Sequence, residues 1–185
     1  MAPSDLQRAN SIRWRPQCCS ERVPTKEGDF HNRGSLFTLD PNSPNLIAPH
    51  HRPYNTLSTG FVMLNNRPLM TLGLMGGDMQ AQGHSQVLVN IIDLGANVQA
   101  ATDMARFHHS EVPNLLQLEG PLYELLAQDL AAMGHTVQRI SGSGVGGYQV
   151  IMFTPYGDAQ PSSSALNGFY RAGSDHRKDG AAIGW

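Results

Sequence analysis

The chain has 185 residues, of which 40% are hydrophobic and 15% charged, and this composition suits a globular, turn-rich protein rather than a coiled coil or a disordered chain. The formal net charge of −2 gives no reason to expect a nucleic acid or an anionic membrane as a partner. The apolar runs are too short to span a bilayer and no signal peptide is visible, so a cytoplasmic location is the default expectation.

Residues 1–28 differ from the rest of the chain. They contain four arginines, both cysteines and no hydrophobic period of 2 or 3.6, which predicts an irregular or disordered leader before a globular segment over 29–185. The two cysteines, Cys18 and Cys19, are adjacent, and adjacent cysteines rarely pair with each other. A reducing compartment is therefore the default, with a reactive or metal-binding pair as the less favoured interpretation.

The first half of the globular segment predicts strands followed by a helix. We expect, in order, a strand over 34–39, a loop over 40–53, strands over 60–64 and 69–74, and a helix over 80–94. Asn65 and Asn66 suit the turn of a hairpin between the two later strands. The helix is indicated by a stripe of Val87, Ile91 and Leu94 at helical spacing.

The second half alternates short strands with two helices. We expect a helix over 98–105, strands over 106–109 and 115–119, a helix over 121–133, and strands over 136–140, 148–154 and 167–172. Asn97 is a suitable N-cap for the first of these helices. The second helix places Leu122, Leu125, Leu126 and Leu130 on one face, which predicts an amphipathic helix.

A glycine pair, Gly76-Gly77, separates an apolar strand from a helix. Such a pair lets backbone N–H groups at a helix entrance approach a ligand, which suits an anion or a developing oxyanion. From spacing alone, a simple tight turn explains the pair equally well.

Two further motifs have structural explanations. Residues 141–147 contain a formal GxGxxG pattern, but a dinucleotide site needs a helix directly after it, and here a strand is expected. We therefore interpret this segment as a flexible hairpin turn. Residues 174–179 place aspartates beside a histidine, an arginine and a lysine, which predicts a solvated turn with internal ion pairs.

The histidine pairs His50-His51 and His108-His109 invite a metal interpretation. Adjacent residues on a strand point to opposite faces, so one pair does not readily hold a single ion, and no HExxH or CxxC spacing is present. No metal and no cofactor are expected.

Five segments of the chain together resemble the C-terminal (small) subunit of gamma-glutamyltranspeptidases and their acylase-like relatives. These segments are NRGSLFTLDPNSPN, APHHRPYNTLSTGF, LMGGDMQAQGHSQVLVNIIDLG, ARFHHSEVP and GSDHRKDGAAIGW, in the family's order and spacing from about Asn32 to Trp185. The resemblance covers about four fifths of the chain and is far more specific than any single motif above.

The resemblance implies an α+β fold, a partial αββα N-terminal-nucleophile hydrolase sandwich. In this family a precursor cleaves itself, and the exposed N-terminal threonine attacks the gamma-glutamyl amide of a substrate such as glutathione. The acyl group then passes to water or to an amino acid. The implied partner is a gamma-glutamyl or related acyl-amide small molecule.

The family's site residues are carried over by position. Gly76 and Gly77 match the glycine pair of the oxyanion site, and Asn55 and Thr56 match two serines that hold the substrate carboxylate. Asn32 matches an asparagine of the family motif.

Two positions depart from glutamyl-specific members of the family. Arg33 stands where those members carry glutamine, and Leu36 where they carry the aspartate that holds the substrate amine. These departures favour relatives that act on other acyl groups, and Arg33 suits a pairing with a substrate carboxylate.

The nucleophile is the largest departure. Thr25 precedes Arg33 by only eight residues, which is too close for the family's threonine, so we expect the nucleophile and the large subunit to lie outside this chain. Three interpretations follow: an inactive fragment of a gamma-glutamyltransferase-like or acylase-type amidohydrolase, a degenerate binding or interaction module, and a subunit complemented by a separate chain. An incomplete sandwich also predicts self-association.

Overall fold

A computed structural model describes residues 12–17, 33–156 and 167–184. It divides into two compact units, one formed by Met1–Gln17 with Ser58–Trp185 and the other by Cys18–Leu57, and each is described by itself. The expectations for Cys18, Cys19 and Asn32 fall outside the described residues.

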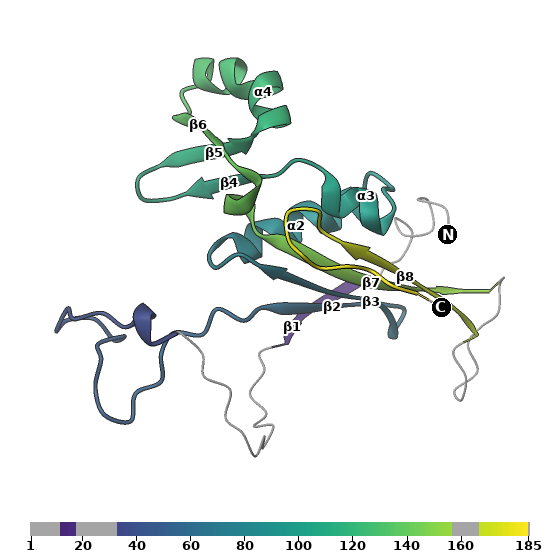
Figure 1. Ribbon diagram of the computed structural model, residues 1–185, viewed down its shortest axis with the longest axis horizontal. Coiled ribbons are helices and arrows are strands. Elements are labelled where there is room, and N and C mark those ends of the chain that lie inside the picture. The colour runs from purple at the N-terminus through teal and green to yellow at the C-terminus, as the bar shows by residue number, and fades with distance from the viewer. Residues whose placement is uncertain (1–11, 18–32, 157–166, 185) are drawn as a thin grey trace. The chain divides into compact units, whose positions relative to one another are not determined.

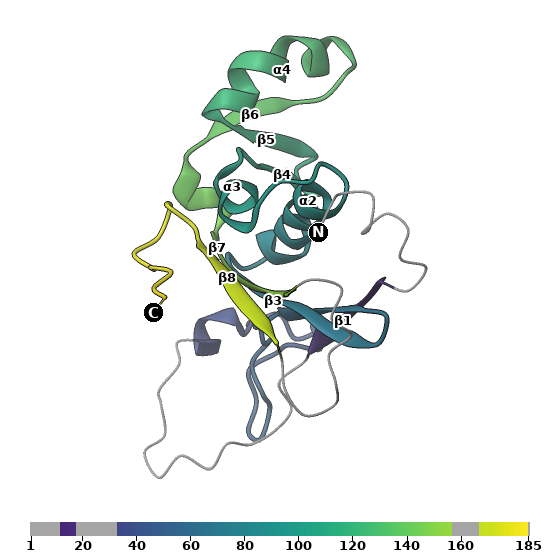
Figure 2. The same cartoon turned by 90° about the vertical axis from the view of Figure 1, so that its right-hand side faces the viewer.

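The larger unit is built on a five-stranded antiparallel sheet (Figure 1). Its strands are β1 (Ile12–Gln17), β2 (Thr59–Leu64), β3 (Arg67–Met75), β7 (Gly147–Pro155) and β8 (Gly168–Ser174), in the spatial order β1-β2-β3-β7-β8. Helices α2 (Met79–Ile92) and α3 (Val98–Asp103) lie against one face of this sheet, as the turned view shows (Figure 2). The structure thus confirms the mixed α+β class.

The core lies between that sheet face and the two helices. It consists of strand residues, the inner stripes of α2 and α3, and one residue from the segment between β6 and β7, namely Val62, Leu64, Leu69, Met70, Leu72, Leu74, Met79, Val87, Ile91, Val98, Ala101, Val145, Tyr148 and Val150. Each large apolar side chain buried there contributes roughly 1.5–3 kcal/mol. Gly83 lets α2 lie close to the sheet, because a Cβ on it would meet Leu74 Cδ2 at 2.3 Å.

A three-stranded sheet forms the remainder of the larger unit. It contains β4 (Phe107–Ser110), β5 (Leu115–Glu119) and β6 (Val137–Ile140), with α4 (Gly120–Ala132) connecting the parallel pair β5 and β6. The side-chain amides of Gln82 and Gln86 on α2 exchange hydrogen bonds of 2.8–3.0 Å with the backbone of His109 and Phe107. Because these glutamines satisfy backbone groups along β4, α2 bridges the two sheets.

Local signals in the sequence predict several details correctly. Asn65 and Asn66 both have positive φ, 51° and 62°, as the tight turn between β2 and β3 requires. Asn97 caps α3, its side chain accepting a 2.8 Å hydrogen bond from the Ala100 amide. The helices predicted over 80–94 and 98–105 appear as α2 and α3, within a few residues at each end.

The strand predicted over 34–39 is wrong. Arg33–Leu36 forms a short 3-10 helix, η1, and only an isolated bridge between Thr38 and Leu46 follows it. Asn45 closes this turn by donating a 2.6 Å hydrogen bond to the Leu36 carbonyl. Local turn bonds satisfy the backbone here, so the apolar residues do not need a strand partner.

The leucine face predicted on α4 is only loosely covered. No residue of this helix is buried, and Leu125 and Leu126 are 73% and 36% exposed. The helix packs on the short strands β5 and β6, which are too few to cover it. The pattern predicts the helix correctly, but not how deeply its apolar face is buried.

Strand β1 lies within residues 1–28, where the sequence predicted irregular structure. The six residues Ile12–Gln17 pair with β2 in an antiparallel register, from Ile12 opposite Leu64 to Gln17 opposite Thr59. Backbone pairing along a sheet edge does not require apolar alternation, which explains why the sequence pattern did not reveal it. The other residues of this segment are outside the described part of the chain.

The second face of the five-stranded sheet carries apolar side chains. We call it the outer face and define it by Phe61, Ile151 and Phe153, which alternate with core residues on β2 and β7, and by Tyr170, which lies opposite Phe153 on β8. Ile151 is 46% exposed and Tyr170 63% exposed, although Tyr170 stacks on Phe153 at 5.5 Å. Exposed apolar patches of this kind mark contact surfaces.

We expect the purified chain to self-associate through the outer face. Ile151→Lys should shift the chain towards monomer in size-exclusion chromatography and reduce binding of a hydrophobic dye, because a charge on an apolar patch resists burial. Gln138→Lys, on an exposed position of β6, is the matched control and should change neither. A wild-type chain that elutes as a monomer and does not bind the dye would show that this face does not drive self-association.

Candidate active site

The turn Gly76-Gly77 lies at the exposed entrance of α2. β3 ends at Met75, both glycines are exposed, and the helix begins at Met79. Gly77 has φ +57°, a conformation that favours glycine, and nothing lies within 4 Å of a Cβ added there. The open space beside Gly77 allows a ligand atom to approach the backbone closely.

The orientation of the peptide groups decides what this turn can bind. The carbonyls of Gly76 and Gly77 accept hydrogen bonds of 3.1 Å from the amides of Met79 and Gln80, so both carbonyls point into the helix. In a trans peptide the N–H lies opposite the preceding carbonyl. The N–H groups of Gly77 and Asp78 therefore point away from the helix, at its positive end, where they suit an anionic oxygen.

The backbone of Gly146 packs against the turn at Gly76, a contact that the sequence did not predict. It has φ +77°, and a Cβ on it would lie 2.4 Å from the Met75 carbonyl oxygen. Gly76 is less constrained but still tight, since its Cβ would meet the Gly146 Cα at 3.1 Å. The two backbones thus pack directly on each other, and the contact requires glycine at position 146.

The segment over 141–147 is consequently not the flexible hairpin turn that we predicted. β6 before it belongs to the three-stranded sheet and β7 after it to the five-stranded sheet, so it connects two sheets. It forms the 3-10 helix η2 (Gly142–Val145), and Val145 is fully buried. The strand that follows is confirmed. Met75 lies opposite Gly147 where β3 pairs with β7. Knowledge of this strand pairing would have predicted that Gly146 lies beside the turn at Gly76, but the sequence does not give the pairing.

The predicted substrate residues lie in the unit Cys18–Leu57. Asn55 is exposed, and its Oδ1 accepts a 3.0 Å hydrogen bond from the Leu57 amide, which forms a local turn. This bond directs the Asn55 carbonyl at its own backbone and leaves the Nδ2 group as the donor for a ligand. Thr56 is half-buried, and Arg33 is half-buried at the start of η1.

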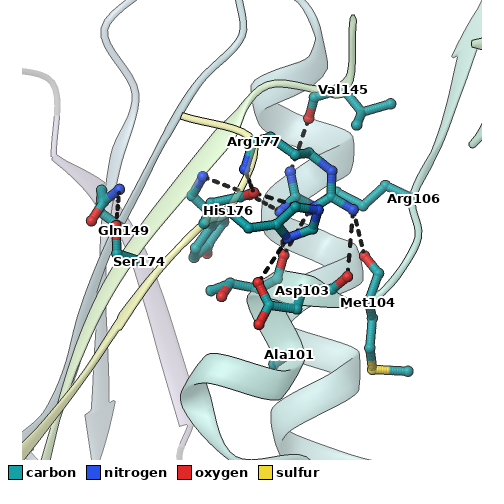
Figure 3. A network of polar contacts seen from close by, with 12 residues as sticks. Ala101, Asp103, Met104, Arg106, Val145, Gln149, Ser174, His176 and Arg177 are labelled. Carbon is teal, nitrogen blue, oxygen red and sulfur yellow. Dashed lines mark hydrogen bonds and ion pairs between the residues drawn. The ribbon is translucent and has the colours of Figure 1, made fainter. Parts of the chain in front are cut away.

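Within the larger unit, a buried ion network ties the C-terminal segment to α3 and the strands beside it (Figure 3). Asp175 is fully buried and pairs with Arg106, which is 1% exposed, and with Arg177 at 3.0 Å. Arg177 also pairs with Glu119 at 2.6 Å. The prediction of a solvated turn at 174–179 is therefore wrong at Asp175 and Arg177. The predicted internal ion pair exists between Asp175 and Arg177, but it is buried, whereas the exposed His176 pairs outside the turn, with Asp103 at 2.9 Å.

Hydrogen bonds determine the charge state of Asp175. Burial alone would raise the pKa of its carboxyl, but donation by the Arg106 side chain and by the Arg177 and Tyr148 amides holds that pKa below its usual value. The pKa of Arg177 is raised, because its bonds to Glu119 and Asp175 outweigh its burial. Asp175 and Arg177 are therefore both charged at neutral pH, and the network that they join is structural.

The histidine pairs take up local contacts. On β4, half-buried His108 lies 3.2 Å from Gln117 Oε1 and exposed His109 lies 2.7 Å from Asn114 Oδ1. His50 and His51 lie in a turn, so the strand argument does not apply to them. Over 33–156 and 167–184 no group of three or more metal-ligating side chains comes together, and no helix there is long and apolar enough to cross a membrane.

Comparison with known proteins first defines the class. The chain superimposes on a cephalosporin acylase from Bacillus halodurans with a TM-score of 0.69 and 36% identity, over 83% of this chain and 27% of the acylase. It also matches the fold of a Helicobacter pylori gamma-glutamyltranspeptidase T380A mutant with a TM-score of 0.66 and 22% identity, over 86% of this chain and 87% of that chain. The fold is thus part of an N-terminal-nucleophile hydrolase fold.

Sequence comparison then gives the family. The gamma-glutamyltranspeptidase family model matches residues 25–185, and the chain belongs to this family. It is 32% identical over 159 residues to a glutathione hydrolase-like YwrD proenzyme of Bacillus subtilis, and 27% identical over 164 residues to an oxamate amidohydrolase proenzyme of Klebsiella pneumoniae. These matches cover 84% of this chain but only 29% of each relative's length.

Proposed function

We propose that this chain provides the oxyanion-stabilising and acyl-binding part of an amide acyl-transfer site. The observation that carries the proposal is the orientation of the Gly77 and Asp78 amides, which point outward at the start of α2. Two N–H donors at a positive helix end stabilise the negative oxygen that develops when a nucleophile attacks an amide carbonyl. The reaction is acyl transfer from a gamma-glutamyl or related amide to water or to an amino acid.

The acyl group is held by the unit Cys18–Leu57 in this proposal. The Asn55 Nδ2 group and the Thr56 hydroxyl bind the substrate carboxylate, and Arg33 adds a positive charge to the same task. Asn32 completes the set by position in the family motif. No carboxylate stands at position 36 to bind a substrate amine, because Leu36 is apolar and 39% exposed.

An acylase-type amidohydrolase is the second candidate, and the apolar Leu36 favours it. A carboxylate-bearing acyl group without an α-amine, such as glutaryl, satisfies Asn55, Thr56 and Arg33 and leaves no buried ammonium without a partner. The cephalosporin acylase match at 36% identity supports this alternative.

The outer face of the sheet supports a partner segment as part of the proposal. An αββα sandwich places a second sheet against this face, and its exposed Ile151 and Tyr170 are the kind of apolar surface that such packing buries. We therefore propose that the large-subunit segment of the family, together with the nucleophilic threonine, completes the fold and the site.

Titration of the ¹⁵N-labelled chain with gamma-glutamyl-4-nitroanilide tests the proposal. We expect chemical-shift changes at the Gly77 and Asp78 amides and at the Asn55 side chain, without release of 4-nitroaniline, because all eight threonines are internal and none has a free α-amine. A glutaryl anilide should bind at least as well if the acylase alternative holds, since it retains the carboxylate and lacks the amine.

Gly77→Val should weaken this binding by about tenfold or more. A β-branched residue is strained at φ +57° and covers the neighbouring N–H groups, whereas His109→Ala changes only an exposed contact with Asn114. Thermal denaturation of both variants separates a lost site from a lost fold. Equal affinity for the wild-type chain and a folded Gly77→Val variant would show that the glycine pair is not the site.

A further inference from the structure

Both backbone groups of Ser58 are held by side chains of one helix. The Gln80 Oε1 atom accepts a 3.0 Å hydrogen bond from the Ser58 amide, and the His84 ring donates from Nε2 to the Ser58 carbonyl at 3.0 Å. Gln80 and His84 are one helical turn apart on α2, so their side chains project from the same face. Ser58 immediately follows Leu57, the last residue of the segment that carries Asn55 and Thr56.

The protonation state of His84 is set by its partners. The Ser58 carbonyl requires a donor at Nε2, and the Tyr148 hydroxyl donates to Nδ1 at 3.1 Å, so the ring is the neutral Nε2–H tautomer. Burial, opposed by the hydrogen bond to Ser58, lowers the pKa of His84. Burial, opposed by the charge of Arg106, raises the pKa of Tyr148 and keeps its hydroxyl a donor.

Rigid surroundings hold the two clamping side chains in place. His84 is 2% exposed and Gln80 8% exposed, and the Tyr148 ring meets the His84 ring edge-on at 5.5 Å. Tyr148 is itself anchored by its backbone, which exchanges hydrogen bonds with Asp175 at 2.9 and 3.0 Å. Polar side chains so deeply buried are expected to have a definite task, since their burial is unfavourable without full pairing.

We propose that Gln80 and His84 are positioning residues that clamp the Ser58 peptide groups and so pre-organise the segment Asn55–Leu57 for its ligand. The clamp acts through the chain, because two residues of backbone keep the Thr56 Cα within about 7 Å of the Ser58 Cα. The same helix begins just after Gly76-Gly77, so α2 carries the oxyanion amides at its start and the Ser58 clamp in its first two turns. This inference rests on the proposed function only for the nature of the ligand.

Four substitutions test the clamp: two at position 80, one at position 82 and one at position 84. Gln80→Met retains the length of the side chain and removes the acceptor for the Ser58 amide, whereas Gln80→Glu restores an acceptor at the same place. Gln82→Met is the matched control, because Gln82 lies on the same helix but bonds to the β4 backbone at His109. His84→Phe removes the second half of the clamp and fills the same space.

The readout is amide hydrogen exchange at Ser58 and ¹⁵N relaxation over residues 55–58 in the free protein. Gln80→Met and His84→Phe should increase amide exchange at Ser58 by about tenfold and raise the mobility of Asn55–Leu57. Gln80→Glu should stay close to the wild-type chain. Gln82→Met should show no change at these positions. The proposal is overturned if folded Gln80→Met and His84→Phe show unchanged exchange and relaxation. It is also overturned if Gln82→Met changes both quantities as much as they do.

Titration with gamma-glutamyl-4-nitroanilide separates this inference from the proposed function. If the wild-type chain binds, Gln80→Met should lose about tenfold in affinity, and a folded variant with unchanged affinity overturns the positioning role. If the wild-type chain does not bind, the proposed function fails, and the exchange and relaxation measurements alone decide whether the clamp exists.

Discussion

Asp175→Ala is expected to destabilise the chain by about 3–5 kcal/mol. The substitution leaves the buried Arg106 guanidinium without its carboxylate partner and removes an acceptor from Arg177 and from the Tyr148 amide. An uncompensated buried charge is among the most destabilising single changes that a protein interior admits. The measurement is the free energy of unfolding from urea denaturation at neutral pH.

Asp103→Ala is the matched control for that experiment. Asp103 pairs with His176 on the surface, where the two side chains are 40% and 60% exposed, so its loss should change the free energy of unfolding by at most about 1 kcal/mol. Similar effects of the two substitutions would show that the Asp175 network is not the structural anchor described above.

The same network predicts an acid limit to stability. Because the pKa of Asp175 is lower in the folded state than in the unfolded chain, its contribution is fully present above the unfolded value of about 3.9. That contribution is lost as the pH falls through the folded value. The wild-type unfolding free energy should therefore fall below about pH 4 more steeply than that of Asp175→Ala.

Gly146→Ala is expected to have the second largest effect, a loss of at least about 2 kcal/mol. The added Cβ would lie 2.4 Å from the Met75 carbonyl oxygen, and the residue would have to keep φ +77°. Since the obstructing atom belongs to the backbone, it cannot move aside without shifting the turn at Gly76. We expect lower stability in urea denaturation together with changed amide shifts at Gly77 and Asp78.

Gly73→Ala provides the comparison within the same sheet. A Cβ at Gly73 meets nothing within 4 Å, so the substitution should change the unfolding free energy by less than about 1 kcal/mol and leave the Gly77 amide unmoved. If Gly146→Ala were equally mild, the packing of the two glycine backbones would not support the turn.

The sequence predicts those features that depend on local signals. The hairpin at Asn65-Asn66, the cap at Asn97 and helix α2 with its buried Val87 and Ile91 all follow from turn chemistry and periodicity. The strand-to-helix turn at Gly76-Gly77 likewise lies where the sequence predicts it, between β3 and α2. The family resemblance, which extends over most of the chain, is confirmed by the family model.

The features that sequence analysis missed depend on contacts between distant segments. Asp175 lies 69 residues from Arg106, so its charge looked solvated until the fold placed the two together. Gly146 looked like part of a flexible turn because nothing local indicates that it packs on Gly76. His84 and Gln80 likewise look like ordinary helix residues, because their partner Ser58 precedes them by 26 and 22 residues.

A crystal structure of the chain with a tetrahedral phosphonate analogue of a gamma-glutamyl amide tests the central claim most directly. We expect one phosphonate oxygen to lie about 2.7–3.1 Å from the Gly77 and Asp78 amide nitrogens, with the analogue's carboxylate on Asn55 and Thr56. Phosphonate bound elsewhere, or Gly77 and Asp78 amides turned into the helix, would contradict it.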